Sequence, residues 1–200
     1  MNRTSIFFTV ICSLILVSYL IWGDTEKKVE QQLLVLAANQ KQYAVFSFCL
    51  LTSDIVLPIP NSIIMYANGF VLGGVAGAGL SLLSLMTGAI AGYYLGKLTA
   101  YGMRAAEDTK ALAFWDKYGV LAILVTRGIP VVSESICIIG GHVRMPFGKY
   151  LLMNLLGYIP ICLLFAFFGR FGYDQSAFLL SLVCSFGIAG LFWWWGKRWL

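Results

Sequence analysis

The sequence predicts an all-α polytopic membrane protein with four full transmembrane helices and two opposed re-entrant hairpins in an inverted-repeat arrangement. Of the 200 residues, 60% are hydrophobic and only 12% are charged, whereas soluble globular domains carry about 25% charged residues. The net charge of +5 comes from basic residues that lie between apolar segments. That distribution is typical of membrane orientation, and we expect no nucleic-acid partner.

Four apolar runs are long enough to cross a bilayer: residues 5–22, 75–95, 147–169 and 177–195. No small-residue cleavage site follows the first run, so it is predicted to be a retained signal anchor. Residues 24–42 are polar and then show helical spacing, which indicates either an amphipathic surface helix or an ordinary connecting helix.

Two further apolar stretches, residues 43–74 and 118–141, are interrupted and do not fit single straight spans. Broken backbone at membrane depth persists only where it lines a cavity or is buried in protein. We therefore predict that each stretch enters the membrane and returns. Three prolines are expected to break the helices and three glycines to allow the sharp return: Pro58, Pro60, Pro130, Gly69, Gly140 and Gly141.

The positive-inside rule favours this arrangement. If both interrupted stretches return to the side from which they came, the basic residues of the long polar segment 97–117 share one side with both termini. If both stretches crossed fully, this bias would be reversed. The N- and C-termini are therefore predicted to be cytoplasmic.

The two interrupted stretches also resemble each other. Pro58 precedes Asn68-Gly69 in the first stretch as Pro130 precedes Gly140-Gly141 in the second. In the predicted topology the two units enter from opposite sides, and broken helices in two inverted halves indicate a transport site near the midplane. Chance similarity among proline- and glycine-containing spans is the alternative.

Arg127 is the first candidate for substrate binding. Its guanidinium stays charged and can grip phosphate oxygens through a bidentate fork. Alternatively, it forms an ion pair with Glu134 or Asp54 and only ties the broken helix together. Glu134 could bind and release a proton or pair permanently with Arg127. Asp54 could play the same part from the other half, or it could simply be exposed at the interface.

Neutral hydrogen bonds to a headgroup are expected from Asn61, Ser62, Ser133 and Ser135. His142 is predicted to be a surface residue or a helix-end partner. Arg144 and Lys149 could attract anionic headgroups, although positive-inside anchoring explains them equally well.

No catalytic chemistry is predicted. The chain has neither H-E-x-x-H nor G-x-S-x-G, and its five cysteines lie in apolar runs without a C-x-x-C pair. We expect no catalytic residue, metal or cofactor, and hence no enzyme. An intramembrane protease or lipid phosphatase is the rival enzyme class.

Several motifs together resemble the VTT domain of the DedA (SNARE-associated Golgi protein) membrane family over roughly residues 43–172. They are Tyr118-Gly119, Thr126-Arg127-Gly128-Ile129-Pro130, Gly140-Gly141, Arg144-Met145-Pro146, Asn154-Leu155-Leu156-Gly157 and, in the first half, Gly92-Tyr93-Tyr94-Leu95-Gly96-Lys97. The resemblance implies two facing re-entrant hairpins and lipid translocation. In eukaryotic relatives this is phospholipid scrambling; in bacterial ones it is recycling of polyprenyl-phosphate carriers, often tied to the proton motive force.

The chain departs from the family pattern in two places. Ser133-Glu134-Ser135 stands where many bacterial members have a second arginine. Asn61 or Ser62 stands where an acidic residue often follows the first proline motif. These departures leave the substrate and the proton coupling open.

The resulting hypothesis is a membrane lipid transporter, a flippase or scramblase of phospholipid or polyprenyl phosphate, with or without proton coupling. Its partners would be lipids with anionic phosphate headgroups, in the bacterial plasma membrane. The alternative is a structural or assembly protein whose buried charges serve folding or partner binding. Three parts are expected: an anchor and amphipathic helix (1–42), the VTT-like domain (43–172) and a final span with an aromatic and basic anchor (173–200).

Overall fold

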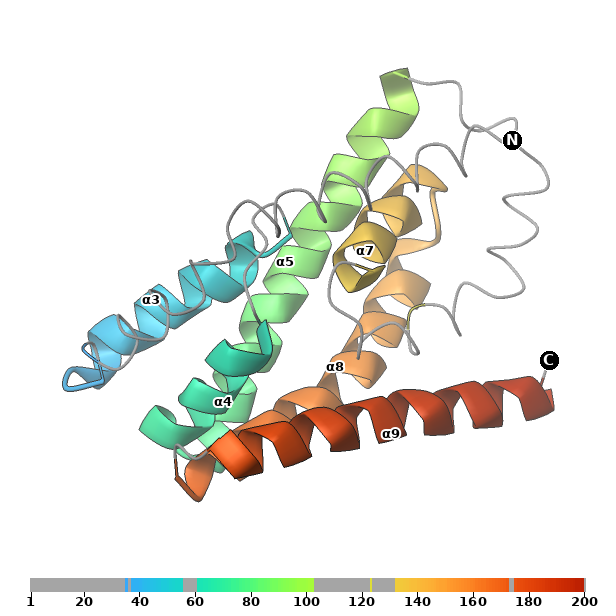
Figure 1. Ribbon diagram of the computed structural model, residues 1–200. Coiled ribbons are helices and arrows are strands. Elements are labelled where there is room, and N and C mark those ends of the chain that lie inside the picture. The colour runs from blue at the N-terminus through green and yellow to red at the C-terminus, as the bar shows by residue number, and fades with distance from the viewer. Residues whose placement is uncertain are drawn as a thin grey trace.

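The computed structural model describes residues 35, 37–55, 61–102, 123, 132–172 and 175–199. These residues form six helices and no strand, which confirms the all-α prediction (Figure 1). The helices are α3 (Gln40–Ser53), α4 (Asn61–Leu72), α5 (Gly74–Gly102), α7 (Val132–His142), α8 (Phe147–Arg170) and α9 (Gln175–Trp199). Several predicted features lie outside the described residues: the first span, Pro58, Pro60, Arg127, Pro130 and most of the segment 97–117.

Two long helices, α5 and α8, form the centre of the described structure (Figure 1). Within the described residues, Gly74–Thr99 and Phe147–Arg170 are long and apolar enough to cross a membrane. The second matches the predicted span 147–169 almost residue for residue. The first extends beyond the predicted end at residue 95, so part of the expected polar segment continues α5.

The interrupted stretches contain short helices. Residues 43–74 include most of α3 and all of α4, which are separate helices on either side of residues 56–60. The second stretch contributes α7. The last helix, α9, begins beside α4 and α8. There the Phe178 ring makes a T-shaped contact with Tyr66, with ring centroids 5.4 Å apart, and a tilted contact with Phe165 at 6.3 Å. From there α9 extends away from the other helices (Figure 1).

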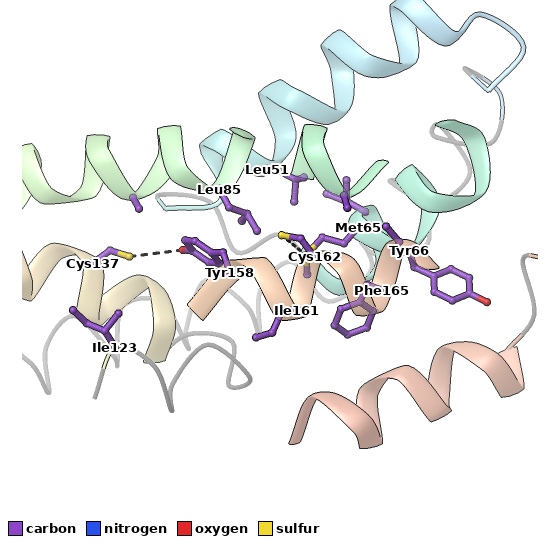
Figure 2. Packing of buried hydrophobic residues seen from close by; sticks show 14 of the residues in the cluster. Leu51, Met65, Tyr66, Leu85, Ile123, Cys137, Tyr158, Ile161, Cys162 and Phe165 are labelled. Atoms are coloured by element: carbon purple, nitrogen blue, oxygen red, sulfur yellow. Dashed lines mark hydrogen bonds between the residues drawn. The ribbon is translucent and has the colours of Figure 1, made fainter. Parts of the chain in front are cut away.

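The buried core lies between α5 and α8. Figure 2 shows Leu85 of α5 close to Tyr158 of α8, with Met65 of α4 near Cys162. The Cys162 and Met65 sulfur atoms are 3.9 Å apart. The core is continuous through all the helices that pack around this pair, so the short helices are held by the same apolar interior.

Glycines let each short helix touch one long helix backbone to backbone. A Cβ added at Gly69 of α4 would overlap the Ala166 carbonyl of α8, and one added at Gly169 of α8 would overlap the Tyr66 carbonyl of α4. Small residues at membrane helix interfaces permit such close approach. Any larger side chain here would push α4 away from α8.

The same contact recurs between α7 and α5. A Cβ added at Gly141 of α7 would overlap the Tyr93 carbonyl of α5, and one added at Gly96 of α5 would overlap the Ile138 carbonyl of α7. Gly69 and Gly141 are 72 positions apart, as are Tyr66 and Ile138. The long-helix partners, Tyr93 with Ala166 and Gly96 with Gly169, are 73 positions apart. The unit α4–α5 thus makes the same contacts as the unit α7–α8, with each short helix packed on the long helix of the other unit.

The structure corrects the prediction for three glycines. Gly69, Gly140 and Gly141 lie inside α4 and α7 and do not end these helices. Their physical role is close helix packing, because a side chain would collide with a neighbouring backbone or ring. The chain instead turns at Gly73 (φ 86°) and Arg144 (φ 54°), the residues just beyond the two helices.

Alanine substitution tests the repeated contact. Gly69→Ala and Gly141→Ala should each destabilise the protein by roughly 1–3 kcal/mol, because a methyl group pressed against a carbonyl cannot be relieved by a rotamer change. The measurement is the apparent melting temperature in detergent. Gly79→Ala is the matched control on α5, since a Cβ there meets nothing within 4 Å. Equal melting temperatures for all three variants would contradict the reciprocal contact.

Candidate functional site

Four predicted site residues lie at corresponding positions of the two short helices. Asn61 and Ser133 are 72 positions apart, as are Ser62 and Glu134, and this is the offset of the glycine contacts. Each pair stands at the start of its helix, α4 or α7. The first N–H groups of a helix have no partner within the helix and carry partial positive charge. The predicted residues therefore lie at the starts of two helices that occupy corresponding positions in the two halves of the chain.

The polar side chains at these helix starts are largely removed from solvent. Ser133 and Ser135 are buried, and Asn61 and Ser62 are half-buried. The Oδ1 atom of Asn61 is buried without a hydrogen-bond partner among the described residues. A buried acceptor of this kind is uncommon and requires an explanation, such as a bound group.

The end of α3 lies close to the middle of α7. A Cβ added at Gly92 of α5 would lie 2.8 Å from Ile55 Cδ1 and 3.3 Å from Cys137 Cβ. Ile55 lies two residues after the end of α3 and Cys137 belongs to α7, so both approach one point on α5. The structure thus brings the end of α3 close to α7, although the two are far apart in the sequence.

Asp54 lies at this end of α3. Its backbone N–H donates to the Leu50 carbonyl at 3.1 Å, and the residue is only 7% exposed. The alternative of simple interfacial exposure is therefore wrong for Asp54. Glu134 belongs to α7 by its backbone, while its side chain and Arg127 lie outside the described residues.

A buried amide holds α3, α4 and α5 together. Asn68 Oδ1 accepts hydrogen bonds from Tyr43 Oη at 2.9 Å and Ser47 Oγ at 2.6 Å. Asn68 Nδ2 donates to Ser81 Oγ at 2.8 Å. All four side chains are fully buried. Because buried polar groups are costly when unpaired, this network fixes the relative positions of the three helices.

The second half has a different polar network at the corresponding place. Asn154, 73 positions after Ser81, donates from Nδ2 to the Tyr150 carbonyl at 2.7 Å. The Cys137 thiol donates to Asn154 Oδ1 at 3.7 Å and lies 4.0 Å from Tyr158 Oη (Figure 2). Each half therefore buries one amide, on the short helix in the first half and on the long helix in the second.

One helix contact pairs a large residue with a glycine in both halves, but the glycine is on the long helix in the first half and on the short helix in the second. In the first, Asn68 packs its backbone against Gly77; in the second, Gly140 packs against the Tyr150 ring, which a Cβ on Gly140 would approach to 2.9 Å. The Tyr150 hydroxyl donates to the Ala89 carbonyl at 2.8 Å. The large and small partners have changed places, so the same helix spacing is kept with different side chains.

His142 is buried at the end of α7, with its Nδ1 atom 2.9 Å from Thr99 Oγ1. Of the two predicted roles, helix-end partner agrees with this contact and surface residue does not. The sequence interpretation missed the structural roles of Asn68 and Asn154. The one signal available was an amide within an otherwise apolar span.

The sequence model of the VTT domain matches residues 59–171, which is 113 of the 200 residues. This chain belongs to the VTT-domain family. The resemblance noted in the sequence is thereby confirmed, and the matched region runs from just before α4 to just after α8. The VTT domain thus contains both short helices, both long helices and all four glycine contacts.

The VTT-domain chain is also similar to three named bacterial proteins. It is 29% identical over 126 residues to undecaprenyl phosphate transporter A of Bacillus subtilis, which covers 56% of this chain and 64% of that protein. It is 24% and 23% identical over 147 residues to two proteins of Lactococcus lactis, from subspecies lactis and cremoris, both called alkaline phosphatase-like protein. These alignments cover 64% of this chain and 69% of each relative. The chain spans less than two thirds of the Bacillus subtilis protein, and no solved structure matches it.

Substitution of Asn68 and of Asn61 tests whether the first is structural and the second belongs to the candidate site. Asn68→Ala should lower stability by about 2–3 kcal/mol, because the Tyr43 and Ser47 hydroxyls lose their buried acceptor. Asn61→Ala should leave stability within about 0.5 kcal/mol, because its Oδ1 atom has no hydrogen-bond partner in the described part of the chain. Thermal unfolding of both variants in detergent makes the comparison. A larger loss for Asn61→Ala than for Asn68→Ala would contradict this assignment.

Proposed function

We propose that this protein is a membrane lipid transporter, a flippase or scramblase of a phospholipid or polyprenyl phosphate. The observation that carries the proposal is the pair of half-length helices, α4 and α7, whose polar starts occupy corresponding positions in two units of the VTT domain. The similarity to a bacterial undecaprenyl phosphate transporter supports the substrate class and a bacterial plasma membrane.

The lengths of the helices suit a membrane. Gly74 and Gly96 of α5 are 22 positions apart, or about 33 Å along a helix, and a bilayer core is about 30 Å thick. α4 joins α5 at Gly74, and α7 packs on α5 at Gly96. The two short helices therefore approach from opposite ends of α5. We place four full spans (residues 5–22, α5, α8 and α9) and two re-entrant hairpins in the membrane, with cytoplasmic termini.

Each short helix reaches about half-way across. α4 has 12 residues and α7 has 11, which correspond to about 18 Å and 17 Å. Their starts would then lie near the midplane and point their partial positive charge into the protein interior. Discontinuous helices hold anionic substrate groups in this way in other transporter folds. The neutral donors would come from Asn61 and Ser62 on one side and Ser133 and Ser135 on the other.

Arg127 would be the charged contact to phosphate. It stands 14 positions before Gly141, as Ile55 stands 14 positions before Gly69, so we expect Arg127 to be the counterpart, in the second half, of the Asp54 end of α3. When the site is empty, Asp54 or Glu134 would pair with the guanidinium. When a lipid phosphate replaces the carboxylate, the released acid would take up a proton, because an unpaired charge is unfavourable in a low-dielectric site. This exchange would couple lipid and proton movement.

The Lactococcus relatives' names make a phosphatase the second candidate. No group of three or more His, Cys, Asp or Glu residues in the described part of the chain could hold a metal ion. The proposed site instead offers helix starts and neutral donors, which bind phosphate without cleaving it. The two candidates differ in product: a transporter moves an intact lipid, while a phosphatase releases inorganic phosphate.

A vesicle assay tests the transport proposal. Purified protein reconstituted with fluorescent phospholipid should move lipid between leaflets, and Arg127→Ala should slow this at least about tenfold, the effect of losing one charge-assisted hydrogen bond to phosphate. Asp54→Asn or Glu134→Gln, whichever removes the carboxylate that pairs with Arg127, should abolish any dependence on a pH gradient. Arg170→Gln, an exposed cation at the end of α8, is the matched control and should behave as the wild type.

Two outcomes would overturn this function. One is lipid movement no faster than in empty vesicles, with added polyprenyl phosphate having no effect on any variant. The other is release of inorganic phosphate from the lipid in the same vesicles, which would favour the phosphatase.

A further inference from the structure

The helices α4 and α8 run in the same direction, and their contacts keep one register. The Met65 and Cys162 sulfur atoms are 3.9 Å apart, and a Cβ on Gly69 would overlap the Ala166 carbonyl. In both contacts the α8 residue comes 97 positions after the α4 residue. The two contacts are four residues apart on each helix, which is about one turn. The register can therefore be extended by one further turn toward the start of α4.

This register places the start of α4 at the level of Tyr158, in the middle of α8. Asn61 lies one turn before Met65, and Tyr158 lies one turn before Cys162. Tyr158 is 11 positions after the first residue of α8, or about 17 Å along the helix. That is about half the thickness of a bilayer core, which is about 30 Å. Tyr158 therefore belongs to the midplane of the proposed membrane arrangement.

The same tyrosine contacts the other short helix. Its hydroxyl lies 4.0 Å from the Cys137 Sγ atom of α7, and Cys137 is one turn beyond Ser133 at the start of that helix. Figure 2 shows Tyr158 between Cys137 on one side and Cys162 on the other. The residue is only 8% exposed, so this contact is inside the protein. Tyr158 thus links the region of the α4 start with that of the α7 start.

The corresponding position of the first half carries no polar side chain. Leu85 of α5 stands 73 positions before Tyr158, and each is 11 positions after the first residue of its helix, Gly74 or Phe147. Figure 2 shows Leu85 and Tyr158 close together. The long helices therefore meet at their midpoints with a leucine from one and a tyrosine from the other. Of these two side chains, only that of Tyr158 can donate a hydrogen bond to a substrate.

We propose that Tyr158 is a further substrate-binding residue, whose hydroxyl donates a hydrogen bond to the lipid phosphate between the starts of α4 and α7. A charge is most costly at the centre of the bilayer, which is the level of this hydroxyl. A phosphate oxygen is also a much stronger acceptor than the Cys137 sulfur. The inference rests on the proposed function and adds to it a contact from a long helix that serves both halves.

Replacing Tyr158 by phenylalanine removes the hydroxyl and keeps the ring. In vesicles that contain full-length protein, Tyr158→Phe should slow the movement of fluorescent phosphatidylglycerol about tenfold, the effect of one hydrogen bond to a charged group. Tyr150→Phe is the matched control on the same helix, because its hydroxyl donates to the Ala89 carbonyl at 2.8 Å. This control should lower the melting temperature and keep the wild-type rate of lipid movement.

A photoreactive residue reads binding directly. The amino acid p-benzoylphenylalanine is incorporated in place of Tyr158 or, as a control, of Leu163, which is 41% exposed on the same helix. The protein is irradiated in micelles with equal amounts of phosphatidylglycerol and diacylglycerol, and adducts are identified by mass. Position 158 should favour phosphatidylglycerol about tenfold, because only this lipid carries a phosphate. Position 163 should label both lipids equally.

The outcomes separate this residue from the transport function. With active wild-type protein, an unchanged rate in Tyr158→Phe would overturn the role of Tyr158 and leave the proposed function standing. Equal slowing in Tyr150→Phe would show a general effect of lost packing and would also overturn it. If the wild-type protein moved no lipid, transport itself would be contradicted. Labelling at position 158 would then still decide, because equal adducts of both lipids would show that no phosphate is bound there.

Discussion

Contact between backbones at four glycines is the constraint on which the rest of the structure depends. Gly69 and Gly169 join α4 to α8, and Gly96 and Gly141 join α5 to α7. No side chain separates these helices, so each short helix is held at one end of the long pair. Dispersion forces and close packing are the main attraction between helices in a membrane, where lipid is as apolar as the side chains. The directions of the two helix starts follow from this packing.

The two halves have the same helix arrangement but pack it with different side chains. In the first half the large Asn68 on the short helix faces Gly77, and in the second half Gly140 on the short helix faces the large Tyr150. The buried amide is on the short helix in the first half and on the long helix in the second. Cores tolerate such changes when total volume and pattern are kept. The polar groups that fix the helices are hydrogen-bonded to one another, whereas the Asn61 acceptor at the start of α4 has no hydrogen bond to any residue that the structure describes. The proposed substrate site lies where the internal hydrogen bonding is incomplete.

The sequence predicted the elements better than their contacts. Hydropathy placed α8 to within one residue, and prolines and polar residues indicated where the first interrupted stretch divides into α3 and α4. The roles of Gly69 and Gly141 were wrong because a glycine lowers helix propensity equally whether it ends a helix or meets a neighbouring backbone. The neighbouring residue determines which role a glycine has, and the neighbours here, Ala166 and Tyr93, are distant in the sequence.

For the candidate site, too, the sequence indicated the residues but not how they are arranged. Asn61, Ser62, Ser133 and Glu134 were named for their chemistry, and their shared position at two helix starts became visible only from the register of the glycine contacts. For His142 the sequence left a surface residue and a helix-end partner open, and it could not decide between them because the partner, Thr99, comes 43 positions earlier. α5 continued past residue 95 because alanine, leucine and lysine favour helix even where hydropathy falls.

The central claim is that a lipid phosphate is bound between the starts of α4 and α7. The most direct measurement is photo-crosslinking with a phospholipid that carries a diazirine beside its phosphate, followed by mass spectrometry of the labelled peptides. The proposed site predicts adducts on both helix starts, around residues 61–62 and 133–135, and their loss in Arg127→Ala. Adducts confined to exposed apolar faces, such as Leu179 and Val183 of α9, and unaffected by that substitution would contradict it.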